Sequence, residues 1–296
     1  MPEGDRGLLS GRPARRRRAR RCPAWYPATG NRRQATDCKR VTRPVNKRRN
    51  PRLEILHDDD SFCAVSKPAG YSTVSERWDH DRICLIDLLW SHWKQTDSAA
   101  PRPHVVHRLD KETSGVILFA RNAVAQSKLR NQFMEREVKK SYGALVKDLP
   151  DPPRGTSIFQ VAENPARPGS MRFQSNGKEC ITEYQVMEAY RDHCWVEARP
   201  RTGRTHQVRM AMAKLGTPCI CDPLYGDGQP LFLSSFKRGY RKGRDAEERP
   251  LLGRLGLHAL SITVRHPVTD DPMTISSSPP KDLAAALRQL RRWSRA

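Results

Sequence analysis

The chain has 296 residues, of which 37% are hydrophobic, and its formal net charge is +22. This length predicts one large domain or two ordinary ones, and the lack of any apolar run of about 18 residues excludes a membrane-spanning helix. The excess of Lys and Arg predicts a polyanionic partner, most commonly a phosphate backbone, with a solubilising surface as the plainer alternative.

The most basic part of the sequence is its N-terminal end. Residues 1–50 hold 16 Lys or Arg against 3 Asp or Glu, including the run R-R-R-R-A-R-R over 15–21. Such a run repels itself and buries nothing, so we predict a disordered basic tail over 1–50 and one ordered domain over 51–296. The tail could be an RNA-binding arm or an organelle transit peptide, or translation could start further in; the sequence leaves these open.

The first half of the ordered part mixes short strands with two helices. In chain order, the apolar patterns predict strands over 53–57 and 62–66, a helix over 83–94, a strand over 115–121 and a helix over 123–137. The first helix places Trp90 and Trp93 on its apolar face, which favours a core role for both rings. Asn122 directly precedes the second helix and can cap it.

Strand patterns dominate the second half. We predict strands over 141–146, 181–190 and 194–199, a helix over 205–215, a strand over 257–264 and a basic closing helix over 281–293. Gly216 ends the third helix, and residues 227–250 resemble a surface insertion. Because strands outnumber helices without regular alternation, we expect an α+β domain with a mixed, mainly antiparallel central sheet and flanking helices.

The eight cysteines are irregularly spaced and form no C-x-x-C pair. The pair Cys219-x-Cys221 is too short for a usual zinc module, so we predict no metal site. No apolar stretch follows the basic N-terminal residues, so we also expect no secretory signal. The cysteines then indicate reduced thiols and a cytoplasmic location.

Two polar segments interrupt the apolar pattern. In the first, 107–115 (H-R-L-D-K-E-T-S-G), Asp110 lies among cations that favour its ionised form, as a nucleophile or base requires. In the second, 199–209 (R-P-R-T-G-R-T-H-Q-V-R), His206 and Arg209 share one face of the predicted helix. Arg209 could reach a buried carboxylate or a phosphate. The plainer alternatives are a turn-capping Asp and a solvated helix end.

Taken together and in order, these segments resemble the RluA-type family of pseudouridine synthases. The resemblance includes K-S-Y-G-A-L-V at 140–146 and D-P-L-Y-G at 222–226, with K-P-A-G at 67–70 and L-H-A at 257–259 as flanking motifs. It covers about residues 53–293 and implies the pseudouridine synthase fold. The small N-terminal RNA-binding domain of many members has no counterpart in residues 1–50, and Cys221 stands where the family more often has Gly.

The resemblance assigns three catalytic residues. Asp110 would be the catalytic carboxylate, and Tyr142 would lie against the target base and take part in proton transfer. Arg209 would hold Asp110 through a salt bridge. Whether the carboxylate bonds the sugar or drives an elimination stays open.

The resemblance also implies contacts with the substrate. Arg108 would enter the space left by a flipped nucleotide, and His107, Arg204 and His206 would bind the substrate. The substrate is expected to be ribosomal or transfer RNA, the protein a monomer without membrane contact, and the reaction free of cofactor and metal. A non-catalytic RNA-binding or ribosome-assembly factor on the same scaffold is the alternative, since fold alone does not imply function.

Overall fold

The computed structural model describes residues 53–75, 83–241 and 247–295. The predicted basic tail over 1–50 therefore lies outside the described residues. The strands are β1 (Glu54–Asp58), β2 (Phe62–Lys67), β3 (His104–Val105), β4 (Ser114–Ala120), β5 (Lys139–Lys147), β6 (Arg154–Glu163), β7 (Met171–Phe173), β8 (Lys178–Ala189), β9 (His193–Pro200), β10 (Leu257–Arg265) and β11 (Pro272–Ser276). The helices are α1 (Leu85–Thr96), α2 (Ala123–Met134), α3 (Gln207–Lys214) and α4 (Lys281–Trp293), with a short 3-10 helix η1 (Leu233–Ser235).

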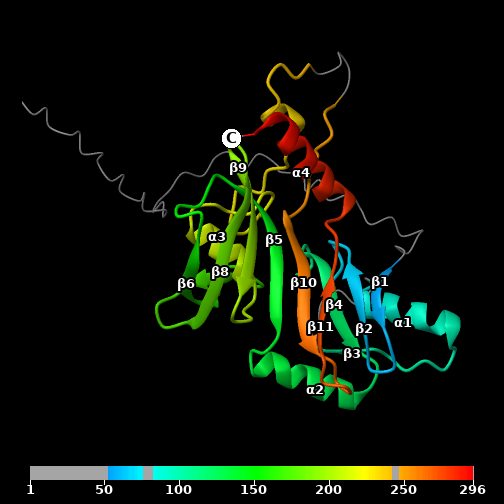
Figure 1. Cartoon of the computed structure of the whole chain (residues 1–296). Helices are drawn as coiled ribbons and strands as arrows, with labels where there is room; N and C mark the ends of the chain where they lie inside the picture. The colour runs from blue at the N-terminus through cyan, green and yellow to red at the C-terminus, as the bar shows by residue number, and fades with distance from the viewer. Residues whose placement is uncertain (1–52, 76–82, 242–246, 296) are drawn as a thin grey trace, which may run out of the picture. The chain divides into compact units, whose positions relative to one another are not determined.

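The described strands form one sheet in the order β1-β2-β4-β10-β5-β9-β8-β6-β7, with β3 and β11 pairing beside β4 and β10 (Figure 1). Within the described part of the chain, β4 and β10 pair in parallel and the other neighbours pair antiparallel. This confirms the predicted α+β class with a mixed, mainly antiparallel sheet. The late strand β10 lies between β4 and β5, which are much earlier in the sequence.

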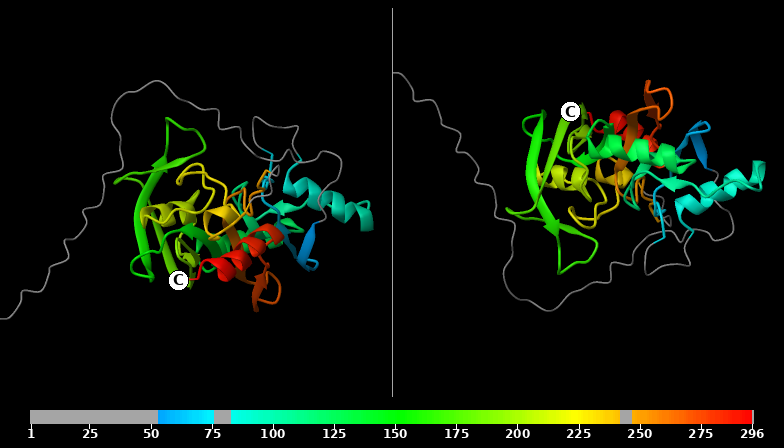
Figure 2. Two further views of the ribbon diagram at one scale, coloured as in Figure 1. Left: turned by 90° about the horizontal axis from the view of Figure 1, so that it is seen from above. Right: turned by 90° about the horizontal axis from the view of Figure 1, so that it is seen from below.

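Helices cover both faces of this sheet. Successive strand residues point to opposite faces, so the side chains of Trp195 and Val196 of β9 lie on different faces of the sheet. Val196 packs in one buried cluster with residues of α3, whereas Trp195 packs in another with residues of α4. Helices α3 and α4 therefore lie on opposite faces of the sheet (Figures 1 and 2).

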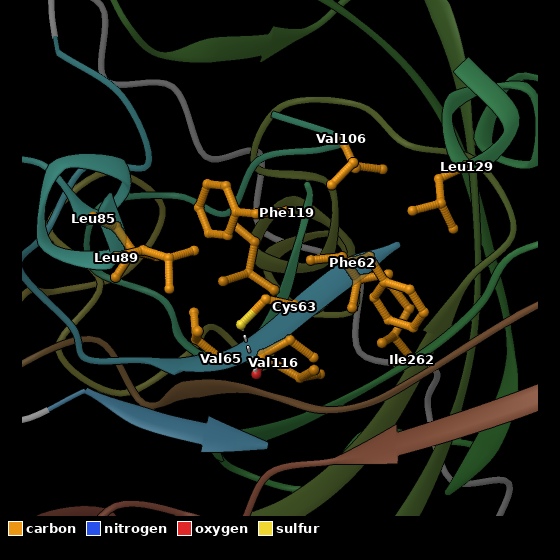
Figure 3. Close-up of a cluster of buried hydrophobic side chains, with 14 of the residues drawn as sticks. Phe62, Cys63, Val65, Leu85, Leu89, Val106, Val116, Phe119, Leu129 and Ile262 are labelled. Carbon is orange, nitrogen blue, oxygen red and sulfur yellow. Dashed lines mark hydrogen bonds between the residues drawn. The ribbon is translucent and has the colours of Figure 1, made fainter. Parts of the chain in front are cut away.

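The largest core surrounds β2 and β4. Figure 3 shows Leu85 and Leu89 of α1 near Phe119, with Leu129 of α2 on the other side of the cluster. Each buried Leu or Phe side chain stabilises the fold by about 1.5–3 kcal/mol. Val106 and Leu109, in the segment that precedes β4, belong to the same buried cluster.

Helices α2 and α3 have other bounds than predicted, for local reasons. Asn122 caps α2 as predicted, its side chain accepting from the Ala125 amide at 2.9 Å, but the helix ends at Met134 and Arg136 takes a positive φ of 62°. Helix α3 begins at Gln207 because His206 has a φ of 57°, in the left-handed region. In α1, Trp93 is buried as predicted, whereas Trp90 is half-buried and donates its indole N–H to the Ala100 carbonyl.

Strands β3, β6, β7 and β11 were not predicted. In β6 the inward positions include the polar Ser157, while the apolar Ile158 points outward with 60% of its surface exposed, so the alternation is broken. Residues 227–250 are more than a surface insertion, because Leu231 and Phe236 are buried in the cluster that contains α4.

Gly115 is the residue where the first polar segment enters β4. Its φ is +116°, and an added Cβ would overlap the backbone of Ala259 in the neighbouring β10. The positive φ strains any residue other than glycine, and the atoms that the added Cβ would meet belong to the rigid backbone. We therefore expect Gly115→Ala to lower the free energy of unfolding by about 3 kcal/mol or more.

Urea unfolding of the purified variant measures this effect. Gly239→Ala is the matched control, because Gly239 also has a positive φ of 67° but no atom within 4 Å of the added Cβ. It should cost only about 1 kcal/mol, from strain alone. Equal losses in the two variants would contradict the close approach of β4 and β10.

Candidate active site

Strand β10 brings the sequence motifs together. Ala259 pairs with Gly115 of β4 on one side and with Tyr142 of β5 on the other. The 107–115 segment leads into β4, and the 199–209 segment runs from the end of β9 into α3. The two segments thus lie within reach of each other although about ninety residues separate them in the sequence.

Asp110 is faced by two nitrogens from the second segment. Its Oδ1 lies 3.9 Å from Nε2 of His206, and its Oδ2 lies 3.9 Å from Nη1 of Arg209. The contact with Arg209 is within ion-pair distance, whereas the contact with His206 is an ion pair only when the ring is protonated; both exceed hydrogen-bond length. The carboxylate keeps 26% of its side-chain surface exposed. It is therefore held between two nitrogen groups and still open to a substrate.

The tight partner of Arg209 is Asp222 and not Asp110. Arg209 donates from Nε and Nη2 to the two oxygens of Asp222, at 2.8 and 2.6 Å. Both side chains are buried, and Asp222 also accepts from the amides of Leu224 and Tyr225. The ion pair with Asp110 that the resemblance implied is present, but it is longer and secondary.

The electrostatics of this pair favour charge. Burial opposes the positive charge of Arg209, but the hydrogen bonds and charge of Asp222 outweigh that effect and raise the pKa of Arg209. A bidentate guanidinium–carboxylate pair also fixes geometry. Arg209 is therefore a permanently charged group whose remaining nitrogen, Nη1, is aimed at Asp110.

Tyr142 lies on β5 and packs against two of the buried clusters. Burial, with a further contribution from the negative charge of Asp110, raises the pKa of its phenol. The hydroxyl is therefore neutral at physiological pH and near enough to Asp110 to feel its charge. This position fits the predicted place against a base, and the catalytic role itself stays a prediction.

His107 is engaged within the protein. Its ring stacks on Phe133 with centroids 4.7 Å apart, and its Nε2 accepts from the Leu118 amide at 3.1 Å. Burial lowers its pKa to about 3, so the ring is neutral. These contacts anchor the loop that carries Asp110, and the predicted contact of His107 with substrate stays a prediction.

Two of the other three predicted substrate residues are arginines; the third, His206, faces Asp110. Arg108 is exposed and forms no ion pair with any described residue, so it is free to meet an anion or to fill a gap. Arg204 is half-buried, and its Nε donates to the carbonyl of Glu179 at 3.4 Å.

Lys67, from the K-P-A-G motif, supports the same loop, a role that sequence reasoning did not assign. It is 1% exposed and donates to the carbonyls of Pro68, Tyr71 and Lys111, at 3.2, 2.8 and 2.9 Å. Burial lowers its pKa to about 7. Because Lys111 follows Asp110, the buried ammonium fixes the backbone beside the carboxylate. A lysine within an apolar strand pattern is the signal that could have revealed it.

No helix among the described residues is long and apolar enough to cross a membrane. The same residues contain no group of three or more His, Cys, Asp or Glu placed to hold a metal ion. The six cysteines within the described ranges are buried and unpaired.

Comparisons with known proteins identify relatives of this chain. A family model described as RNA pseudouridylate synthase matches residues 61–214. The chain is 35% identical over 244 residues to the ribosomal large subunit pseudouridine synthase D of Xanthomonas campestris, covering 81% of this chain and 70% of that protein. It is 33% identical over 234 residues to the dual-specificity RNA pseudouridine synthase RluA of Escherichia coli, covering 78% and 95%.

A solved structure extends the likeness to the fold. The human RNA pseudouridylate synthase domain containing 4 superposes with a TM-score of 0.64 at 28% identity, covering 80% of this chain and 93% of that one. The sheet and its flanking helices are therefore shared beyond the matched motifs.

Proposed function

Because this chain belongs to the RluA-type family of pseudouridine synthases, and is thus an isomerase that acts on RNA, we propose that it converts specific uridines of ribosomal RNA to pseudouridine. Asp110 is the catalytic carboxylate in this proposal. The single observation that supports it best is the position of Asp110, which is exposed to a ligand and faced by His206 and Arg209. The choice of ribosomal RNA follows the names of relatives such as that of Xanthomonas campestris.

The reaction breaks the bond from N1 of uracil to C1′ of the ribose, turns the base, and forms a bond from C5 to C1′. The proton on C5 is lost and a nitrogen of the base gains one, so atoms and electrons balance without a redox partner. Breaking the glycosidic bond builds positive charge on the sugar, which a nearby carboxylate can stabilise or trap. Asp110 supplies that carboxylate in either case.

The neighbouring residues take complementary roles. Arg209 faces the carboxylate of Asp110 with a positive charge at 3.9 Å and helps to hold it in place. The neutral phenol of Tyr142 contacts the base and can pass on the proton from C5. Removing a uridine from the stack costs a few kcal/mol, and the exposed Arg108 offsets part of this by filling the gap. Exposed Lys and Arg side chains bind the phosphates.

The experiment that tests the function is a pseudouridine map of cellular RNA with and without the gene, repeated after complementation with Asp110→Ala. We expect the same few ribosomal sites to be lost in the deletion and in the Asp110→Ala strain. Purified protein should restore them in RNA from the deletion strain. Loss of sites in transfer RNA instead would identify transfer RNA as the substrate. No change in any RNA would favour the non-catalytic RNA-binding alternative.

A further inference from the structure

The imidazole of His206 lies between the candidate catalytic carboxylate and a tyrosine. Its side chain is 11% exposed, with Nε2 directed at Asp110 and Nδ1 lying 2.9 Å from the hydroxyl of Tyr225. The left-handed backbone of His206 holds the ring there, at the start of α3. The two ring nitrogens thus face different groups, and the proton can sit on only one of them when the ring is neutral.

The second contact of Tyr225 decides which nitrogen carries the proton. The backbone N–H of Met171 donates to the same hydroxyl oxygen at 2.9 Å. The hydroxyl proton of Tyr225 is then directed at its other neighbour, Nδ1 of His206. If Nδ1 donated instead, this proton would have no acceptor among the hydrogen bonds of the described residues. Burial lowers the pKa of His206, which favours the neutral ring. A neutral imidazole that accepts at Nδ1 carries its own proton on Nε2.

We propose that Tyr225 is a positioning residue that fixes His206 as its Nε2–H tautomer, so that the imidazole donates to Asp110 during the reaction. The inference rests on the proposed function, because it assigns the reaction to Asp110. Oδ1 then meets an N–H of His206 while Oδ2 meets an N–H of Arg209. Both contacts are 3.9 Å without substrate, and such contacts commonly tighten when the substrate binds.

The consequence is a carboxylate oriented from both sides. Two donors, one facing each oxygen of Asp110, restrict the rotation of its carboxylate while positive charge grows on the ribose. In the opposite tautomer a lone pair on Nε2 would face the oxygen of Asp110 and repel it. The hydroxyl of Tyr225 therefore acts on the chemistry without touching the substrate, as an orienting group does behind a catalytic histidine.

Nitrogen NMR of the full-length protein, labelled at histidine, reads the tautomer directly. We expect His206 to show a protonated Nε2 and an unprotonated Nδ1, and Tyr225→Phe to show a mixture of tautomers. A protonated Nδ1 in the parent protein would overturn the proposal. This arm needs no RNA and does not depend on activity, so it decides the tautomer even if the proposed function fails.

Kinetics then test the role of the tautomer. Tyr225→Phe should lower kcat by about 10- to 100-fold, the usual cost of losing a group that orients a functional histidine, with KM for RNA nearly unchanged. His206→Gln, whose amide nitrogen can replace Nε2–H, should retain more kcat than His206→Phe. Tyr184→Phe is the matched control, since it removes a buried hydroxyl that bonds only the Pro152 carbonyl, and its kcat should match the parent.

The outcomes are separable. If the parent forms pseudouridine and folded Tyr225→Phe keeps its kcat, the positioning role is wrong while the proposed function stands. If Tyr225→Phe unfolds, the ranking of the two His206 variants still tests the donor to Asp110. Equal kcat values for Gln and Phe at position 206 would overturn it.

Discussion

Asp110→Asn is expected to lower kcat for pseudouridine formation by about 10³-fold or more, because it removes the charge of the proposed catalytic carboxylate while keeping the shape of the side chain. The dissociation constant for RNA should change little, since the contacts with phosphates come from the basic side chains around the site. Single-turnover assays on a ribosomal RNA fragment measure the rate, and filter binding measures the affinity.

The neighbouring Glu112→Gln provides the matched control for charge. It removes the same charge from the same loop, two residues away, and Glu112 faces neither His206 nor Arg209 at ion-pair distance. Its activity should stay within about twofold of the parent, a surface-type effect. Near-parental activity of Asp110→Asn, or equal losses in both variants, would contradict a catalytic role for Asp110.

Asp222→Ala is expected to lower the stability of the protein strongly. Asp222 is fully buried and pairs with the buried Arg209 through two hydrogen bonds. Removing one partner of a buried ion pair leaves an uncompensated charge, at a cost of about 3–5 kcal/mol in the free energy of unfolding. The amides of Leu224 and Tyr225 lose their acceptor as well. Urea unfolding at neutral pH measures the loss.

A double variant separates stability from catalysis. Arg209→Met with Asp222→Leu replaces both charges by apolar groups of similar volume, an exchange that is often neutral for stability. We expect it to unfold near the parental urea concentration, yet to form pseudouridine as poorly as Asp110→Asn, because Asp110 has lost its cation. Parental stability of Asp222→Ala, or an active double variant, would contradict the role of this pair.

Most of the fold could be predicted from local pattern. The predictions located α1, α2, α4 and the buried β4 because each has apolar residues at a regular spacing and clear ends, such as the cap at Asn122. Strand β6 escaped because Ser157 occupies an inward position and Ile158 an outward one. Its place is decided by pairing with β8 along almost its whole length, and one sequence does not reveal such pairing.

The site was predicted in outline for a related reason. The resemblance to the RluA-type family implied a salt bridge between Asp110 and Arg209, and the structure places the two side chains at ion-pair distance. The closer pairing of Arg209 with Asp222 was not foreseen, although D-P-L-Y-G had been noticed as a motif. Several carboxylates in the sequence could have paired with Arg209, and only the three-dimensional path of the 222–225 turn determines which one does.

The position of β10 has a consequence for how the protein is made. Asp110 precedes β4, and Tyr142 lies on β5. These two strands are joined through β10, which begins at residue 257. A growing chain on the ribosome therefore carries both groups long before it has the strand that sets them side by side. Contacts so distant in sequence form late and slowly. A chain that ends before residue 257 therefore lacks the strand pairing that joins the two halves of the candidate site.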